Sequence, residues 1–174
     1  IDPGVEVYVS KSAGAKRCVP ADVAVKVMQA VYACPCGVDR MSLVMENLVD
    51  TSNNLAIVKS EKGKIIVRTL MRGSCDTAKH DLSEAIRAVF ELAGAKVAFS
   101  GGYSGWQPNM ESPILKTMKE TYKNLYGVEA DVKAIHAGLE CAIISNNYPH
   151  WDMISCGPTL MSPHSPEERV LIPT

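Results

Sequence analysis

The sequence has no long apolar run, no excess of charge of one sign and few aromatic residues. No stretch approaches the roughly 18 consecutive apolar residues that a membrane-spanning helix requires. The net charge is −1, and acidic and basic residues are interspersed along the chain. Neither a basic face nor an RNA-type aromatic motif is present. The composition therefore argues against nucleic acid and membranes as partners.

A secretory signal and a disulfide framework are also lacking. The six cysteines fall inside apolar segments, and Cys34-Pro35-Cys36 is too tightly spaced for a zinc knuckle, which places two to four residues between ligands. Free, buried thiols in a reducing compartment are the interpretation, and they indicate a soluble, cytoplasmic protein. The chain starts at Ile1 and ends in an apolar run, as expected of a piece of a longer protein.

With 174 residues, of which 47% are hydrophobic, the chain can form a real core in one ordinary domain or two small ones. Its first part predicts a strand at 6–9, a helix at 20–33, a hairpin of strands 54–58 and 64–70, a helix from Asp76 or Thr77 to Gly94, and a strand at 96–99. This order is the ferredoxin-like βαββαβ pattern.

The glycine-rich segment around 101–105 predicts a boundary and a hinge, and the pattern changes beyond it. Ser112 and Pro113 predict the start of a helix that Gly127 ends. Strands are expected at 131–135 and 151–156, with a short helical turn at 140–145. Alternating helices and strands favour an α/β layer with a parallel sheet, in which ligand sites gather at the carboxyl ends of strands. The overall fold class is therefore α/β.

His164 is the strongest single candidate for a metal ligand. It lies between Pro163 and Pro166, just beyond the expected strand 151–156, where a loop opens the next helix. Flanking prolines restrict the backbone, and neutral imidazole is the commonest protein metal ligand. A loop histidine that is simply solvated is the alternative.

Five motifs in one order carry a resemblance to a known family. They are Asp50-Thr51-Ser52-Asn53-Asn54, Met71-Arg72-Gly73-Ser74, Gly105-Trp106-Gln107-Pro108-Asn109, His136-Ala137-Gly138-Leu139-Glu140, and Ser155-Cys156-Gly157-Pro158 leading to Ser162-Pro163-His164-Ser165-Pro166. Together they resemble the carboxyl-terminal part of aminoacyl-histidine dipeptidases, which are co-catalytic zinc exopeptidases related to aminoacylases.

The resemblance implies a ferredoxin-like lid domain over 1–104, incomplete at its N-terminus, and the C-terminal part of the catalytic domain over 105–174. It implies hydrolysis of Xaa-His dipeptides such as β-alanyl-histidine by a hydroxide bridging two zinc ions, for which cobalt or manganese could substitute. His164 would be a zinc ligand, Arg72 would bind the substrate carboxylate, and Gly138 would contribute backbone near the substrate. The lid would form a homodimer.

No catalytic residue is assigned within this chain. The family's general base, a Glu-Glu pair and the remaining ligands come from the N-terminal half of its catalytic domain, and nothing here matches them. The isolated chain is therefore expected to be inactive. Two alternatives stay open: an aminoacylase or desuccinylase of the same superfamily, and a non-catalytic dimerisation module.

Several residues keep a second interpretation. Arg72 could be a solvated strand-end arginine, and His136 could be a core histidine rather than a residue of the substrate pocket. Asn53 and Asn54 would ordinarily mark a turn before a strand, although a substrate or dimer role is open. Glu167 or Glu168 could hold a ligand histidine in place, or could open the helix expected there.

Overall fold

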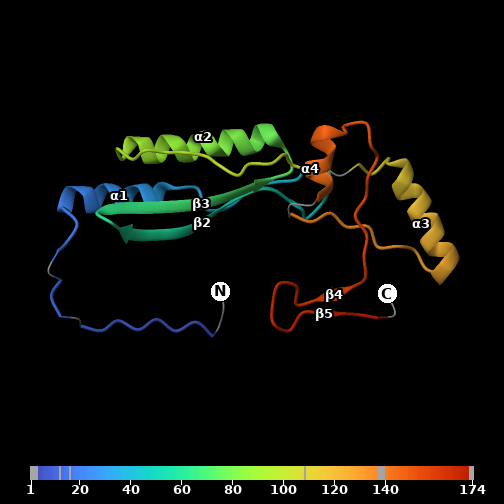
Figure 1. Ribbon diagram of the computed structural model, residues 1–174, viewed down its shortest axis with the longest axis horizontal. Coiled ribbons are helices and arrows are strands. Elements are labelled where there is room, and N and C mark those ends of the chain that lie inside the picture. The colour runs from blue at the N-terminus through green and yellow to red at the C-terminus, as the bar shows by residue number, and fades with distance from the viewer. Residues whose placement is uncertain (1–3, 12, 16, 108, 137–139, 173–174) are drawn as a thin grey trace.

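The computed structural model describes residues 4–11, 13–15, 17–107, 109–136 and 140–172. The chain is a mixed α/β protein with antiparallel sheets (Figure 1). One part combines two helices with a three-stranded sheet, and the other holds two more helices and a two-stranded ladder. No helix among the described residues is long and apolar enough to cross a membrane.

The expected hairpin is present and longer than the pattern indicated. Strand β2 runs from Val49 to Glu61 and pairs in antiparallel fashion with β3, Lys64–Gly73. Lys62 and Gly63 form the two-residue connection, both with positive φ (50° and 74°). Such a turn matches the right-handed twist of paired strands, which explains why Gly stands there.

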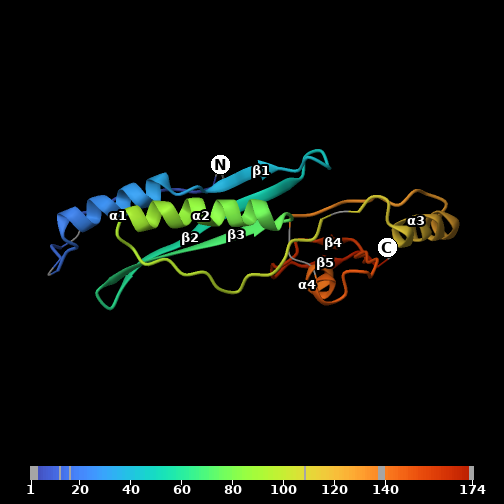
Figure 2. The same cartoon turned by 90° about the horizontal axis from the view of Figure 1, so that it is seen from above.

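Two helices cover one face of this sheet (Figures 1 and 2). Helix α1 spans Ala21–Ala33 and helix α2 spans Asp76–Leu92, close to the expected ranges. The apolar stripe of α2 packs inward, since Leu82 and Ile86 are each 3% exposed and Val89 is partly buried against the same cluster. Ala30, Cys34 and Phe90 complete the small core.

The ferredoxin-like strand order is not complete in the described residues. Residues 6–9 and 96–99, expected to be strands, are not in strands. An extended segment becomes a strand only when a neighbour satisfies its backbone groups, and neither finds one there. The third strand is instead β1, Gly37–Met41, which pairs with β2 and which the sequence pattern did not reveal. All five of its residues are exposed, so no apolar alternation marks it.

The expected parallel sheet in the second part was also wrong for the described residues. Residues 131–135 and 151–156 have no strand structure, and the ladder present is antiparallel, between β4, Leu160–Met161, and β5, Arg169–Val170. As in the first part, apolar β-propensity is present but a pairing partner is not. The short helix expected near 140–145 is present as α4, Glu140–Asn147.

Helix α3, Pro113–Tyr126, begins and ends where the sequence predicted. The Ser112 hydroxyl accepts a hydrogen bond from the Leu115 backbone N–H at 3.1 Å, and Gly127 adopts the left-handed conformation (φ 71°) that commonly follows a helix. Ser112 is 2% exposed. The Asp152 carboxylate accepts from the Ile114 N–H at 2.8 Å, which ties the start of α3 to the later segment.

Candidate functional site

Polar groups concentrate at the end of the hairpin where β2 begins and β3 ends. Asp50, Thr51 and Asn53 are at most 9% exposed. The Asp50 carboxylate accepts hydrogen bonds from the hydroxyls of Thr51, at 2.8 Å, and Ser74. These bonds satisfy a buried carboxylate without a salt bridge and join the start of β2 to the residue after β3.

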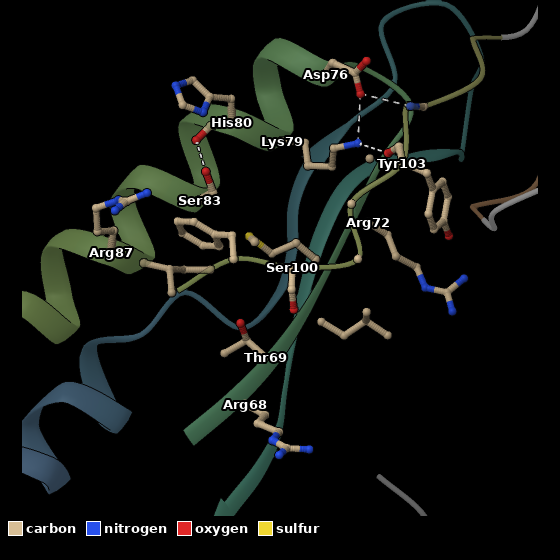
Figure 3. A pocket seen from close by; sticks show the side chains of 18 of the residues that line it. Arg68, Thr69, Arg72, Asp76, Lys79, His80, Ser83, Arg87, Ser100 and Tyr103 are labelled. Atoms are coloured by element: carbon tan, nitrogen blue, oxygen red, sulfur yellow. Dashed lines mark hydrogen bonds and ion pairs between the residues drawn. The ribbon is translucent and has the colours of Figure 1, made fainter. Parts of the chain in front are cut away.

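Arg72 lies on the opposite face of the hairpin from the core. Its Cα partner in the ladder is Ser52, whereas Met71 on the adjacent position packs against the core cluster. Side chains alternate along a strand, so Ser52 and Arg72 share the outer face. Figure 3 shows the Arg72 guanidinium pointing away from α2 into open space. An exposed planar cation with five donors is suited to bind a carboxylate.

His136 reaches this same place from a segment far along the chain. Its Nε2 atom lies 2.6 Å from the Ser52 hydroxyl. Burial and the charge of Arg72 lower the pKa of His136, while the Asp50 carboxylate and a hydrogen bond to the Val49 backbone act in the opposite direction. The imidazole is therefore neutral at pH 7. His136 is half-buried beside Arg72, which favours the pocket interpretation over that of a core histidine.

A second set of bonds fixes the segment that follows α2. Lys79 binds the Asp76 carboxylate at 2.9 Å and the Tyr103 carbonyl at 2.6 Å, and the Gly105 N–H donates to Asp76 at 3.0 Å (Figure 3). The bond with Lys79 holds the pKa of the Asp76 carboxyl below its ordinary value. Gly105 lies directly against the Ser74 carbonyl, so a side chain there has no room.

These elements enclose a cleft. It is lined by β3, by one side of α2, by residues 93–106, and by residues 132–136 and 151–155. Arg72 and His136 are both among its lining residues, and His164 is not. The structure thus brings Arg72 together with Ser52 and His136, but it does not place His164 in the same cleft.

His164 lies in a turn between β4 and β5 rather than in a loop that opens a helix, so that expectation was wrong. Its φ is 62°, and Ser162, two residues earlier, also has a positive φ of 51°. The Glu168 carboxylate accepts from the His164 backbone N–H at 2.7 Å, and the Ser165 hydroxyl donates to the Ser162 carbonyl at 2.8 Å. Glu168 therefore holds the turn through the backbone and begins no helix. The imidazole carrier is exposed.

A complete metal centre is not formed by the residues that the structure describes. No three His, Cys, Asp or Glu side chains among them converge on one point. A zinc site requires three or four protein ligands. His164 could supply one ligand, so the described residues alone do not fit the two-metal centre that the resemblance implied.

Two further predicted residues have other outcomes. Gly138 lies outside the described residues. Asn53 is neither a turn residue nor exposed: it sits within β2, is 3% exposed and donates to the Pro35 carbonyl at 2.6 Å. Its neighbour Asn54 is exposed. Ser52, which sequence patterns did not single out, is recognisable only from its ladder position opposite Arg72 and its contact with His136.

Comparison with known proteins agrees with this arrangement. No family model matches the sequence. The chain is 39% identical over 145 residues to the cytosol non-specific dipeptidase of Escherichia coli (strain K12), a match that covers 83% of the chain and 30% of that protein. The crystal structure of aminoacylhistidine dipeptidase from Vibrio alginolyticus superimposes with a TM-score of 0.82 and 37% identity, over 96% of the chain.

The chain is a relative of the aminoacylhistidine dipeptidases. The resemblance seen in the five motifs is thereby confirmed, and the mixed α/β fold is shared with the Vibrio alginolyticus dipeptidase. The chain spans about one third of the length of these relatives, 30% of one and 34% of the other.

Proposed function

We propose that this chain is the C-terminal part of a dipeptidase that hydrolyses Xaa-His and related dipeptides. The observation that carries the proposal is the structural match to an aminoacylhistidine dipeptidase over 96% of the chain at 37% identity. At this level of identity a shared fold commonly goes with a shared active-site architecture. The Arg72 cluster supplies a chemical reason in addition, because a dipeptide carries a free carboxylate at its C-terminus.

Arg72 is assigned the substrate carboxylate. The guanidinium can donate two parallel hydrogen bonds to the two carboxylate oxygens, and its exposed position at the cleft leaves these donors accessible. Gly138 is assigned a backbone contact to the substrate through the motif that follows His136. Its proximity in sequence to His136, a cleft residue, supports that assignment.

His164 is assigned as a metal ligand, with zinc as the expected ion and cobalt or manganese as substitutes. Its turn is held by bonds to the Glu168 carboxylate and within residues 162–165, so the ligand is presented from a defined backbone. Two metal ions would polarise a scissile carbonyl and activate water. Since the described residues contain no complete site, the further ligands and the general base would belong to parts of the relatives that this chain does not span.

The division into a lid domain, 1–104, and a catalytic part, 105–174, is part of the proposal. Two helices on one face of an antiparallel sheet support a lid, and the glycines at 101, 102 and 105 support a junction. The outer face of the hairpin exposes Ile57 (41%) and Leu70 (54%), and the edge strand β1 is exposed throughout. A homodimer through the lid would cover such surfaces. A cytoplasmic location is supported by the name of the Escherichia coli relative and by six free cysteines.

Two alternatives predict different outcomes. An aminoacylase or desuccinylase would cleave acylated amino acids and leave dipeptides intact. A dimerisation module without catalytic function would associate but would show no hydrolysis in any context. The exposed hairpin face alone is compatible with the second alternative, whereas the Ser52, Arg72 and His136 cluster favours substrate binding.

The deciding experiment is an assay of β-alanyl-histidine hydrolysis by the full-length protein that the proposal requires, with added zinc and with a chelator. We expect activity that the chelator removes and that His164→Ala lowers by at least about 100-fold, as loss of a metal ligand or its support commonly does. His150→Ala, at an exposed turn, is the matched control and should stay active. The chain alone should be inactive. Cleavage only of acylated amino acids would overturn the proposal.

A further inference from the structure

Ser52, Arg72 and His136 form one cluster whose geometry goes beyond a single binding arginine. Ser52 and Arg72 face each other across the β2–β3 ladder, and the Ser52 hydroxyl lies 2.6 Å from Nε2 of His136. Directly opposed side chains on one face of an antiparallel pair have Cβ atoms about 5 Å apart, within easy reach of an arginine side chain. The imidazole, the hydroxyl and the guanidinium are thus neighbours.

The hydrogen bonds of His136 define the direction in which the hydroxyl proton points. The Val49 backbone accepts a hydrogen bond from the ring, which places a proton on the nitrogen that does not face Ser52. A neutral imidazole carries only one N–H, so Nε2 has a free lone pair and accepts from the Ser52 hydroxyl. The Ser52 oxygen then presents its own lone pairs outward, where an N–H of Arg72 can donate to it.

The surrounding charges keep this arrangement in balance. The charged groups that face the imidazole are Arg72, from β3, and Asp50, from β2. Arg72 and burial lower the pKa of His136, while Asp50 raises it, and the lowering effects are the larger. Asp50 is itself held by the hydroxyls of Thr51 and Ser74. An uncharged imidazole can lie beside a guanidinium without repulsion, whereas an imidazolium cannot.

We propose that Ser52 and His136 are positioning residues that hold the Arg72 guanidinium as a carboxylate-binding subsite, and that a bound carboxylate favours the protonated form of His136. The first half follows from the chain of hydrogen bonds from Val49 through His136 to Ser52. The second half follows from charge, since a carboxylate on Arg72 offsets the repulsion that an imidazolium would meet. That the carboxylate is the terminus of a dipeptide rests on the proposed function; the subsite itself does not.

The test uses N-acetylglycine as the probe and N-acetylglycinamide as its uncharged match. Side-chain ¹H–¹⁵N correlation spectra of the chain would follow the titration of His136 with each compound. We expect N-acetylglycine to raise the pKa of His136, and the amide to leave it unchanged. Ser52→Ala should weaken N-acetylglycine binding about 5-fold, the worth of one hydrogen bond, while Ser60→Ala, an exposed position on the same strand, should not.

His136→Gln separates positioning from general stability. Glutamine keeps an acceptor for the Ser52 hydroxyl but cannot titrate, so N-acetylglycine should still bind near pH 7, and the change in its affinity between pH 7 and pH 5 should disappear. An unchanged pH dependence in this variant would overturn the role of His136. Retained binding in Arg72→Ala would overturn the subsite itself. If Arg72→Ala loses binding but Ser52→Ala and His136→Gln do not, the carboxylate site of the proposed function stands and the positioning inference fails.

Discussion

The hydroxyl of Ser52 and Nε2 of His136 lie 2.6 Å apart although 84 residues separate them in the chain. This contact joins the hairpin to the segment that precedes α4 and brings both residues beside Arg72. A binding arginine on a strand has many available rotamers, and neighbours that restrict it reduce the entropy lost when a ligand binds. The contact thus relates the fold of the hairpin to the chemistry of the cleft.

Replacing Arg72 by lysine should weaken binding of substrates with a free carboxylate. Lysine retains the charge but loses the planar pair of donors, so KM for a dipeptide should rise about 10-fold, which corresponds to a charge-assisted hydrogen bond. The C-terminal amide of the same dipeptide should show no further loss. Steady-state kinetics with both substrates measure the difference. Arg68→Lys, on the same face of β3, is the control and should leave KM within 2-fold.

His136 should make the folded state less stable in acid. Its pKa is lowered in the folded protein, while in the unfolded chain it returns to about 6.5. Below pH 6.5 the unfolded state therefore binds more protons, so protonation favours unfolding and stability falls as the pH decreases through the folded pKa. Urea unfolding at pH 7.5 and pH 5.0 measures this loss.

The same comparison in His136→Gln should show a smaller loss of stability on acidification than the wild type. His150→Gln, which replaces an exposed histidine on the turn near Trp151, should behave as the wild type does. An equal acid response in all three proteins would contradict the assignment of His136 as a partly buried, neutral residue.

Gly105→Ala should destabilise the protein by about 2 kcal/mol, since an added Cβ would overlap the Ser74 carbonyl and force the backbone apart. For a chain of this length the loss corresponds to a melting temperature about 4–8 °C lower. Gly102→Ala is the control, because nothing lies within 4 Å of the added atom. Circular dichroism melts of the two variants would distinguish them, and equal melting temperatures would disprove the close packing.

Leu82→Ala should cost about 2–5 kcal/mol because the side chain is 3% exposed at the centre of the core cluster. Leu92→Ala, on the same helix but 89% exposed, should change stability by no more than about 0.5 kcal/mol. Urea denaturation gives both values. A small effect at Leu82 would mean that the cluster does not form the principal core of this part.

Sequence patterns identified the elements that local interactions define. Ser112, Pro113 and Gly127 set the ends of α3 because capping and backbone conformation are properties of a few adjacent residues. Lys62 and Gly63 give the hairpin turn for the same reason. The stripe of Leu82, Ile86 and Val89 identified α2, since burial on one side of a helix repeats every three to four residues.

The same patterns failed where a partner had to be known. Residues 6–9, 96–99, 131–135 and 151–156 have apolar, strand-like composition, yet none is a strand among the described residues. Strand β1 has little apolar character but pairs with β2 through its backbone. Pairing depends on which segment lies alongside, and composition does not contain that information.

For the candidate site, the sequence by itself determined the motifs, the family resemblance and the residue types: an arginine for a carboxylate, and a histidine between prolines. Tertiary structure decided which of these meet. It brought His136 to Ser52 and Arg72 and left His164 in a separate turn. The physical reason is range, because capping, turns and periodicity act over a few residues, whereas a binding cluster forms only when the packed fold brings distant segments into contact.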